Sequence, residues 1–350
     1  MTGRPHATPE RSPANGKAPN VGANPVSRRG LFLRALIGFG VLSGYLAAVL
    51  IGSIRALPDR KLTGFDRLAT PGESVELVAK IEIDGPGFVN PDVAGVEIEF
   101  LGPRAAEKPA QGAILHSDPA GLARTASSFP KSGSAISNKD GIARLRVDAP
   151  KERGDYHVLA RVVNAEGLQL RESVVPLVLS VLEPAERIVI TDIDNTIAHT
   201  SLPSLLKDKP EESPPLDRAP QALNAIAASH RIIYLTARPA PLTQRTRRWL
   251  ARHGFPLGAV LLRDLEGEYK QLNFDEGEFK RILIRDTILP RWPNVAWGIG
   301  NTENDVYAFA LQKLRVIILE ADIQKIEAQL RPFVRTAKDW NEVLRIVEGI

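Results

Sequence analysis

From Arg187 to the C-terminus, short runs of β-branched residues alternate with longer segments of helical pattern, and this alternation restricts the fold more than any other feature. The alternation is typical of a parallel, doubly wound α/β sheet that binds ligands at the carboxyl ends of its strands. We therefore expect an α/β domain over residues 186–350. The predicted strands are 187–191, 231–235, 259–262, 295–299 and 315–319, and the predicted helices include 241–253 and 304–314.

Two aspartates follow the first predicted strand, in the run ITDIDNT at residues 190–196. Asp192 and Asp194 are spaced i, i+2 and point the same way, and their combined negative charge is costly without a cation. Mg²⁺ relieves that cost by binding carboxylate and phosphate oxygens. Asp192 would then act as a nucleophile that forms an acyl-phosphate, and Asp194 as the acid and base. For an isolated DxD pair, a strand-end turn that caps a helix is the simpler explanation.

Further polar groups lie near the other predicted strand ends and helices, and together with DxDxT they resemble the four motifs of the haloacid dehalogenase superfamily. The resemblance implies phosphate binding by Thr236, Lys280 and Arg238. It also implies a Mg²⁺ site made of Asp192, Asp194, Asn301 and Asp305. These residues stand in YLTAR (234–238), EFKRIL (278–283) and GNTEND (300–305).

A closer resemblance covers residues 186–320. YLTARPAPL (234–242), GFPLG (254–258) and LLRD (261–264) resemble phosphatidate phosphatase catalytic domains of the yeast actin-patch type, and GIGN through DVY (298–307) resembles lipins. The resemblance implies hydrolysis of phosphatidate to diacylglycerol. DIDNT departs from DIDGT or DIDDT but keeps both aspartates. Residues 201–220 are too short for a large cap domain, and an open site suits a lipid phosphomonoester.

Two alternatives stay open. One is a phosphatase of soluble phosphomonoesters or phosphoproteins on the same framework. The other is a non-catalytic sensor of lipid or phosphate, against which the retention of Asp192 and Asp194 argues.

Residues 68–183 have a different pattern of apolar and polar side chains from the α/β segment that follows them. Apolar and polar side chains alternate with period two between Gly, Pro and Asp turns, for example at 75–83, 156–162 and 175–181, which indicates an antiparallel β-sandwich. The segments DGIA (140–143) and GDY (154–156) resemble late strands of bacterial immunoglobulin-like domains. We assign this domain no chemistry and expect a loop at 117–137.

The N-terminal segment predicts a membrane protein. Residues 1–29 are rich in Pro and polar residues and are expected to be disordered, as a cytoplasmic tail. Residues 35–54 carry no charge and would span about 30 Å as a helix, which favours a transmembrane anchor over a buried core helix. Arg28, Arg29 and Arg34 place the N-terminus in the cytoplasm and the catalytic part outside the cytoplasmic membrane. The segment SRRGLFLR (27–34) resembles a bacterial twin-arginine export signal, so residues 30–55 are either a transmembrane anchor or part of such a signal. Arg55 stands where a cleavage site needs a small residue, which favours an uncleaved anchor.

Composition limits the partners. The net charge of +4 fits an anionic membrane surface but is too small to indicate nucleic acid. There are no cysteines, which excludes disulfides, a thiolate nucleophile and Cys-ligated metal. Arg245, Arg247, Arg248 and Arg252 form a basic face on a predicted helix, for which a solvated surface is the commoner explanation and binding of anionic headgroups the alternative. No obligate protein partner is inferred.

Overall fold

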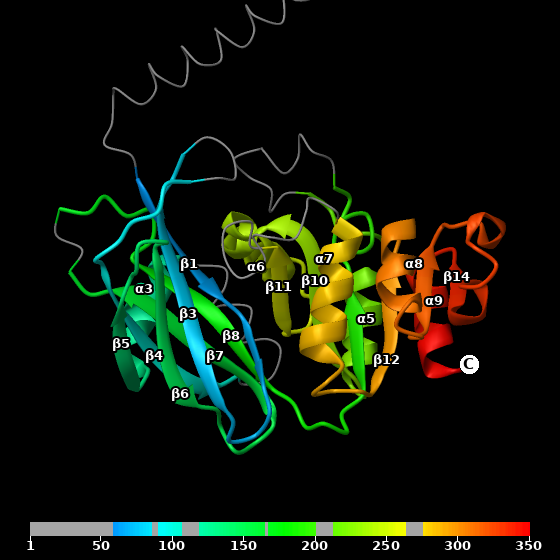
Figure 1. The fold of residues 1–350 in the computed structure, drawn as a ribbon, viewed down its shortest axis with the longest axis horizontal. Helices are drawn as coiled ribbons and strands as arrows, with labels where there is room; N and C mark the ends of the chain where they lie inside the picture. Colours follow the sequence, from blue (N-terminus) through cyan, green and yellow to red (C-terminus); the bar gives the residue numbers. More distant parts are fainter. Residues whose placement is uncertain (1–58, 86–89, 107–118, 165–166, 201–212, 264–275) are drawn as a thin grey trace, which may run out of the picture. The chain divides into compact units, whose positions relative to one another are not determined.

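The computed structural model describes residues 59–85, 90–106, 119–164, 167–200, 213–263 and 276–350. Within these ranges, no helix is long and apolar enough to cross a membrane. The predicted tail 1–29 and anchor 30–55 lie outside the described residues, so both stay predictions. Leu57–Ile350 forms one compact unit, which contains an all-β part followed by an α/β part (Figure 1).

The all-β part is built from two sheets that share one core. The three-stranded sheet has the order β1-β3-β6, and the five-stranded sheet has the order β2-β8-β7-β4-β5. Leu77 and Ile81 from the first sheet pack with Phe100 and Val158 from the second, and all four are fully buried. The strands are β1 (Arg60–Phe65), β2 (Arg67–Ala69), β3 (Ser74–Ile83), β4 (Glu97–Ala105), β5 (Lys131–Ile136), β6 (Ile142–Asp148), β7 (Gly154–Val162) and β8 (Val174–Val181).

This part confirms the prediction of strands but differs from it in three details. β1 and the short β2 begin before residue 68, and β2 pairs with β8 in parallel, whereas the other pairs in both sheets are antiparallel. The predicted loop at 117–137 is wrong, because this segment contains the helix α3 (Pro119–Thr125), the 3₁₀ turn η1 (Ala126–Ser128) and β5. β5 has the sequence KSGSAI and pairs only with β4 in its sheet, so its exposed polar residues hide the period-two pattern. An immunoglobulin-like fold for this part stays a prediction.

The α/β part contains a six-stranded, wholly parallel sheet of order β11-β10-β9-β12-β13-β14. The chain adds strands on one side of β9 and then on the other, so the direction of winding reverses at β9, where such sheets bind ligands. The doubly wound sheet is therefore confirmed. Its strands are β9 (Ile188–Thr191), β10 (Arg231–Pro239), β11 (Ala259–Arg263), β12 (Val295–Gly300), β13 (Val316–Leu319) and β14 (Val334–Ala337).

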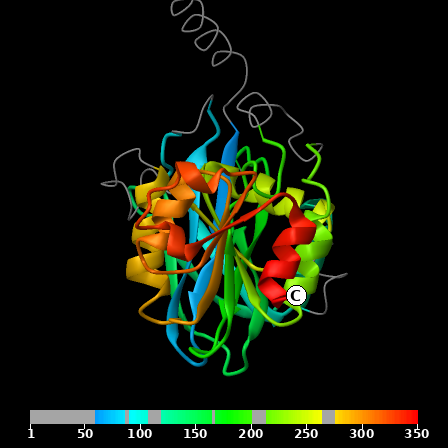
Figure 2. The same ribbon diagram turned by 90° about the vertical axis from the view of Figure 1, so that its right-hand side faces the viewer.

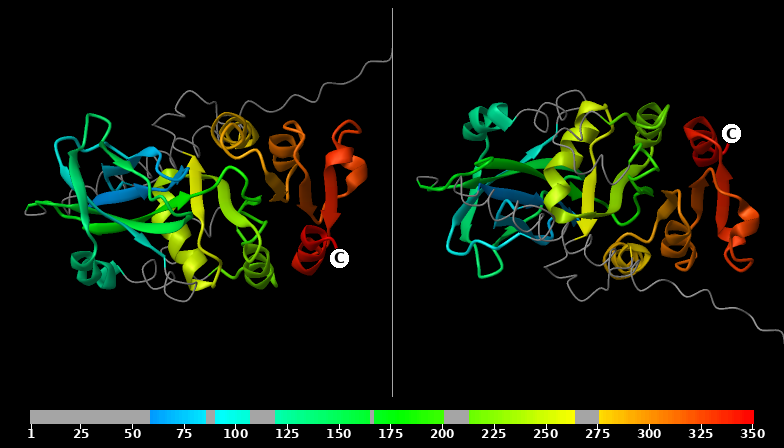
Figure 3. Two further views of the ribbon diagram at one scale, coloured as in Figure 1. Left: turned by 90° about the horizontal axis from the view of Figure 1, so that it is seen from below. Right: turned by 90° about the horizontal axis from the view of Figure 1, so that it is seen from above.

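Helices cover both faces of this sheet. Figure 2 shows α5 and the C-terminal α9 on one face and α7 and α8 on the other, and Figure 3 shows α7 and α9 on opposite sides. The side chains of α6 pack in the same buried cluster as those of α5 and α9. The bounds are α5 (Ala219–Ala227), 3₁₀ turn η3 (Ala240–Leu242), α6 (Thr243–Arg252), α7 (Glu276–Ile282), π-helix η4 (Leu283–Ile288), α8 (Glu303–Ala310), 3₁₀ turns η5 (Ile323–Lys325) and η6 (Arg331–Phe333), and α9 (Trp340–Glu348).

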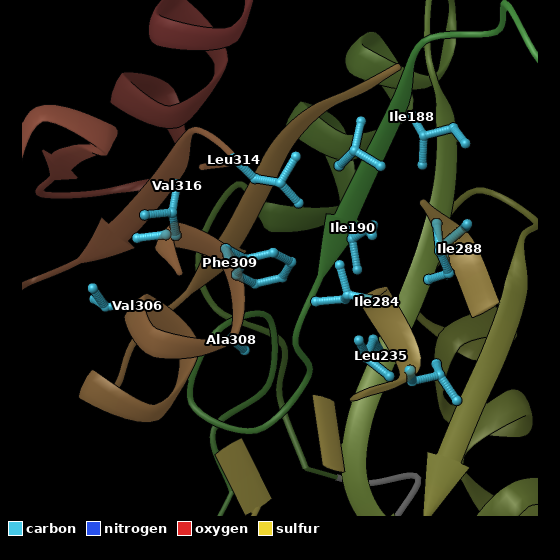
Figure 4. Close-up of a cluster of buried hydrophobic side chains, with 14 of the residues drawn as sticks. Ile188, Ile190, Leu235, Ile284, Ile288, Val306, Ala308, Phe309, Leu314 and Val316 are labelled. Carbon is cyan, nitrogen blue, oxygen red and sulfur yellow. The ribbon is translucent and has the colours of Figure 1, made fainter. Parts of the chain in front are cut away.

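The cluster between the sheet and α8 needs a glycine in β12. Phe309 of α8 packs among Ile188, Ile190 and Leu314 in this cluster (Figure 4). A Cβ on Gly298 would lie 2.3 Å from Cγ of Phe309, so only glycine lets the helix approach the strand this closely.

The all-β part covers an edge of the α/β sheet through Asp66, which lies between β1 and β2. The Asp66 carboxylate accepts hydrogen bonds from the backbone N–H of Val178 in β8 and of Val260 in the edge strand β11, the latter at 2.7 Å. It also pairs with Arg247 of α6, and both side chains are buried. Gln244 of α6 adds a hydrogen bond of 3.2 Å to the carbonyl of Pro176 in β8.

The predicted solvated face of the α6 helix is therefore wrong for two of its arginines. Arg247 is 3% exposed and bound to Asp66, and Arg248 pairs with Glu172 just before β8. An arginine-rich pattern on one helix could not reveal acidic partners located some 80 to 180 positions earlier in the chain. Trp292 and Trp297 are both buried.

Candidate active site

The turn after β9 is set by Asn195. Its φ of 54° lies in the left-handed region, which Gly, Asn and Asp tolerate better than other residues. Its backbone N–H donates to the carbonyl of Ala198 at 2.9 Å, and its side-chain oxygen accepts from the N–H of Thr200 at 3.1 Å. The position at which DIDNT departs from DIDGT and DIDDT is thus occupied by a residue that suits the same turn.

Asp192 directly follows β9 and is buried, with an exposed fraction of 5%. Its Oδ1 accepts a hydrogen bond of 2.7 Å from Nζ of Lys280, and its Oδ2 lies 3.2 Å from the Thr196 hydroxyl. Burial raises the pKa of Asp192 to about 7, with further raising by Asp305 and Asp194, while Lys280 acts in the opposite direction. The carboxylate is therefore held in a site that already contains an excess of negative charge.

Lys280 of α7 connects Asp192 of the DIDNT motif with Asp305 of the GNTEND motif. Its Nζ donates to Asp192 and, at 2.6 Å, to Oδ1 of Asp305, and all three side chains are buried. Although burial alone lowers the pKa of Lys280, the two carboxylates outweigh burial and raise it. The ammonium is therefore fixed as a cation next to the predicted nucleophile.

Asp305 is fixed by the start of α8. Its Oδ2 accepts from the backbone N–H groups of Asn301 and Thr302, at 3.1 and 3.0 Å, and from the Thr302 hydroxyl at 2.8 Å. Thr302 and Asp305 form a capping box. A Cβ on Gly300 would lie 2.3 Å from Cβ of Asp305, which explains the glycine that ends β12.

The Asp194 carboxylate is directed to Arg238 and Thr236, at the end of β10. Nη2 of Arg238 donates to Oδ1 of Asp194 at 2.8 Å, Nε donates to both oxygens, and the Thr236 hydroxyl donates to Oδ2 at 3.1 Å. Burial raises the pKa of Asp194, but Arg238 and these hydrogen bonds outweigh it, so the pKa is lowered. Thr246 of α6 accepts a hydrogen bond of 3.0 Å from Nη1 of Arg238 and holds the guanidinium in place.

The seven predicted site residues thus form two adjoining groups around β9. Asp192, Lys280 and Asp305 are joined by ion pairs, and Asn301 is linked to Asp192 by the Thr196 hydroxyl, whose distance to Oδ1 of Asn301 is 3.1 Å. The second group is Asp194 with Arg238 and Thr236. Three carboxylates face two cations, which leaves one negative charge in excess.

The predicted metal ligands do not all converge. Among the described residues, no group of three or more His, Cys, Asp or Glu is placed so that it could hold a metal ion. Asp192 shares Lys280 with Asp305 and the Thr196 hydroxyl with Asn301, whereas the Asp194 side chain is occupied by Arg238. Ligation of Mg²⁺ by Asp194 therefore stays a prediction.

Three residues that support the site were not predicted. Trp340 of α9 donates from Nε1 to the carbonyl of Thr196 at 2.8 Å, and Thr246 supports Arg238. Thr302 caps α8, and its spacing to Asp305, T-x-x-D, is a capping signal that could have identified it. His199, three residues beyond Thr196, is exposed, and nothing in the described part of the structure assigns it a role.

Comparison with known proteins identifies the class of chemistry. Residues 187–311 match the family model for the catalytic domain of phosphatidate phosphatase APP1, and this range includes every predicted site residue. The protein is a phosphoric monoester hydrolase. The match, together with the four motifs around the parallel sheet, supports a haloacid dehalogenase-like phosphatase.

Solved structures that resemble the phosphatase are distant. D,D-heptose 1.7-bisphosphate phosphatase from B. bronchiseptica, complexed with magnesium and phosphate, is 16% identical over 47% of this chain and 98% of its own, with a TM-score of 0.34. A chain of the Pnkp1/Rnl/Hen1 RNA repair complex is 16% identical over 35% of this chain and 38% of its own, with a TM-score of 0.29. TM-scores of this size carry no argument about function. No curated protein sequence matches the chain.

Proposed function

We propose that the protein is a Mg²⁺-dependent phosphatidate phosphatase that works through an aspartyl-phosphate and releases diacylglycerol. The observation that carries this proposal is the match of residues 187–311 to a phosphatidate phosphatase catalytic domain. The presence of both Asp192 and Asp194, with Lys280 and Arg238 bound to them, favours catalysis over a sensor role.

In the first step, an oxygen of the Asp192 carboxylate attacks phosphorus, and the bond from phosphorus to the ester oxygen breaks. Nζ of Lys280 lies 2.7 Å from Oδ1 of Asp192. Oδ2, whose hydrogen-bond partner among the described residues is the Thr196 hydroxyl, is therefore the freer oxygen for attack. Asp194 protonates the leaving alkoxide. In the second step, Asp194 takes a proton from water, which attacks phosphorus and releases Asp192 and inorganic phosphate.

Arg238 connects these steps to substrate binding. While it holds Asp194, the lowered pKa keeps that carboxylate ionised, which suits the second step but not the first. A bound phosphate competes for the guanidinium, and its charge favours the protonated form of Asp194. Substrate binding would thus prepare Asp194 to act as an acid.

The donor set fits Mg²⁺. Asp192, Asn301 and Asp305 supply the carboxylate and amide oxygens that this ion prefers, and the excess negative charge of the site needs a cation before a phosphate dianion can enter. When bound, Mg²⁺ would neutralise phosphate oxygens and the developing charge. Asp194 is the further predicted ligand.

We further propose that residues 35–54 anchor the enzyme in the bacterial cytoplasmic membrane, with the catalytic part outside it. The support is the uncharged stretch and its arginine-rich N-terminal flank. Phosphatidate or a related anionic lipid in that bilayer would be the substrate.

The test uses residues 57–350, which form a compact unit with their own cores. Phosphate release from phosphatidate in detergent micelles is measured with Mg²⁺, with EDTA, and in the Asp192→Asn variant. We expect release that needs Mg²⁺ and falls by on the order of 10⁴-fold in the variant, as when a nucleophile is removed. Turnover of p-nitrophenyl phosphate without release from phosphatidate would contradict the lipid substrate and favour soluble phosphomonoesters.

A further inference from the structure

Helix α6 contacts the all-β part along one of its faces. Gln244, Arg247 and Arg248 are spaced i, i+3 and i+4, so they lie on the same side of the helix. Gln244 donates to a backbone carbonyl of β8, and the two arginines pair with acidic residues of the all-β part. These three contacts fix how α6 lies against that part.

The opposite face of α6 reaches the candidate active site. Thr246 follows Gln244 by two positions, which is a rotation of about 200° around the helix axis. Its side chain is fully buried, and its hydroxyl accepts a hydrogen bond of 3.0 Å from Nη1 of Arg238. One short helix therefore contacts the all-β part on one side and Arg238 on the other.

Strand pairing alone holds the backbone of Arg238 poorly. β10 pairs with β9 only as far as Tyr234, and its pairing with β11 shifts register between Thr236 and Pro239. Arg238 therefore lies in the irregular end of β10, where a regular ladder does not fix the backbone. The position of its guanidinium depends on the contacts that its side chain makes.

Among these side-chain contacts, the one with Thr246 is expected to last through the reaction. In the proposed mechanism, a bound phosphate takes the guanidinium of Arg238 from Asp194. The Thr200 hydroxyl lies 3.4 Å from Nη2 of Arg238, at the limit of a hydrogen bond. Thr246 is thus the acceptor that holds Arg238 both before and after the phosphate binds.

The segment from Arg238 to Arg248 is tied to the all-β part near both of its ends. Nζ of Lys61 in β1 donates to the carbonyl of Pro241, in the turn η3 that leads into α6. Glu172, just before β8, pairs with Arg248. The two contacts leave little freedom to the segment that carries both Arg238 and the threonine bound to it.

We propose that the all-β part supports catalysis by fixing α6, and that Thr246 is the positioning residue through which it holds Arg238 in place for the phosphate. The inference rests on the role of Arg238 in the proposed function but not on the lipid substrate. It gives the all-β part a task in the reaction. Because a displacement of about 1 Å in a phosphate-binding group can lower the rate about 100-fold, a small loosening of α6 is measurable.

The test measures kcat/KM for p-nitrophenyl phosphate with Mg²⁺, on residues 57–350. Thr246→Val removes the hydroxyl at nearly constant volume and should lower kcat/KM about 10-fold, as expected for the loss of one hydrogen bond to a charged group. Thr246→Ser keeps the hydroxyl and should recover most of this loss. The double variant Lys61→Met/Glu172→Gln changes only the all-β part and should lower kcat/KM about fivefold. Glu97→Gln, in β4 and two strands from β8, is the matched control and should act like the wild type.

A double-mutant cycle shows whether the all-β part acts through Thr246. If it does, Thr246→Val added to Lys61→Met/Glu172→Gln should give the about 10-fold loss of Thr246→Val alone, because the contact is already broken; independent effects would multiply to about 50-fold. Three outcomes would overturn the proposal: multiplied losses, an unchanged kcat/KM in Lys61→Met/Glu172→Gln, or a Thr246→Ser variant as impaired as Thr246→Val. Far-UV circular dichroism shows that each variant is folded.

Arg238→Gln separates this proposal from the proposed function. It should lose at least as much activity as Thr246→Val, and a wild-type kcat/KM would refute the role of Arg238 itself. An impaired Arg238→Gln beside a fully active Thr246→Val would refute the positioning role alone. A wild type that hydrolyses p-nitrophenyl phosphate but never phosphatidate would refute the lipid substrate and leave the positioning role standing.

Discussion

The Asp66–Arg247 pair allows a sharp test, because its two partners are not equivalent. Asp66 receives two backbone N–H groups and one guanidinium, from β8, β11 and α6. Arg247 has Asp66 as its ion-pair partner, its Nε is buried without a hydrogen-bond acceptor, and burial lowers its pKa to about 9. The carboxylate is therefore expected to contribute far more to stability than the arginine.

The magnitudes follow from these contacts. Asp66→Ala leaves a buried guanidinium unpaired, which costs about 3–5 kcal/mol. It also leaves two buried N–H groups without acceptors, at roughly 1–3 kcal/mol each before relaxation. Because these effects overlap, we expect a total loss of about 4–6 kcal/mol. Arg247→Met keeps the volume and removes a poorly satisfied cation, while Asp66 retains its two N–H donors, so we expect a loss of only about 1–2 kcal/mol.

Thermal unfolding measures both variants and reports on each part separately. The four tryptophans, at 249, 292, 297 and 340, all lie in the α/β part, so their fluorescence follows that part alone, whereas far-UV circular dichroism follows both. In the wild type the two signals should change together. In Asp66→Ala the midpoint should fall by about 10 °C or more, at about 2 °C per kcal/mol for a unit of this size, and the two signals should separate.

Arg345→Met on the surface of α9 is the matched control and should unfold like the wild type. If Arg247→Met lowered the midpoint as much as Asp66→Ala, the arginine rather than the carboxylate would be the main support, and the reasoning would be refuted.

Three further predictions concern the site and its core. Gly298→Ala would place a methyl group 2.3 Å from the ring of Phe309, so we expect a loss of about 1–3 kcal/mol in a urea titration; an unchanged midpoint would contradict the packing argument. Asn195→Gly should keep the turn and the activity, whereas Asn195→Val, strained at a φ of 54°, should cost about 1–2 kcal/mol, and equal stability of the two variants would count against the turn. Trp340→Phe removes the N–H donated to the Thr196 carbonyl, so we expect a loss of about 1–3 kcal/mol and a lower kcat with little change in KM; a change in KM alone would assign Trp340 to substrate binding instead.

The sequence predicted the structure best at the ends of strands, where the candidate site residues directly follow the strand that positions them. β-branched runs predicted β9 to β13, and the spacing of Asp192 and Asp194 after the first of them predicted the centre of the site. Parallel topology then brought Thr236 of β10 and Asp305, which follows β12, to the same place, because strand ends in such a sheet share one edge, and Lys280 joins them from α7.

The remaining features depend on contacts between distant segments. α5, β14 and α9 were not predicted, and Trp340, which supports the Thr196 loop, belongs to the last of these. The arginines of α6 were predicted to form a solvated surface, because no residue near them in the sequence indicates that Asp66 and Glu172 pair with Arg247 and Arg248. In the structure Asp192 pairs with Lys280 and Asp194 with Arg238. The sequence could not predict this pairing, because two carboxylates spaced i, i+2 could each bind either cation.

The hydrogen bond from Val260 to Asp66 has a consequence for how this enzyme can be divided. β11 is the last strand on its side of the sheet, and without the all-β part its outer backbone groups would be open to pairing with another polypeptide. A phosphatase domain cut at residue 186 would lose this protection, and Arg247 would lose its counter-ion. We therefore expect such a truncated domain to self-associate.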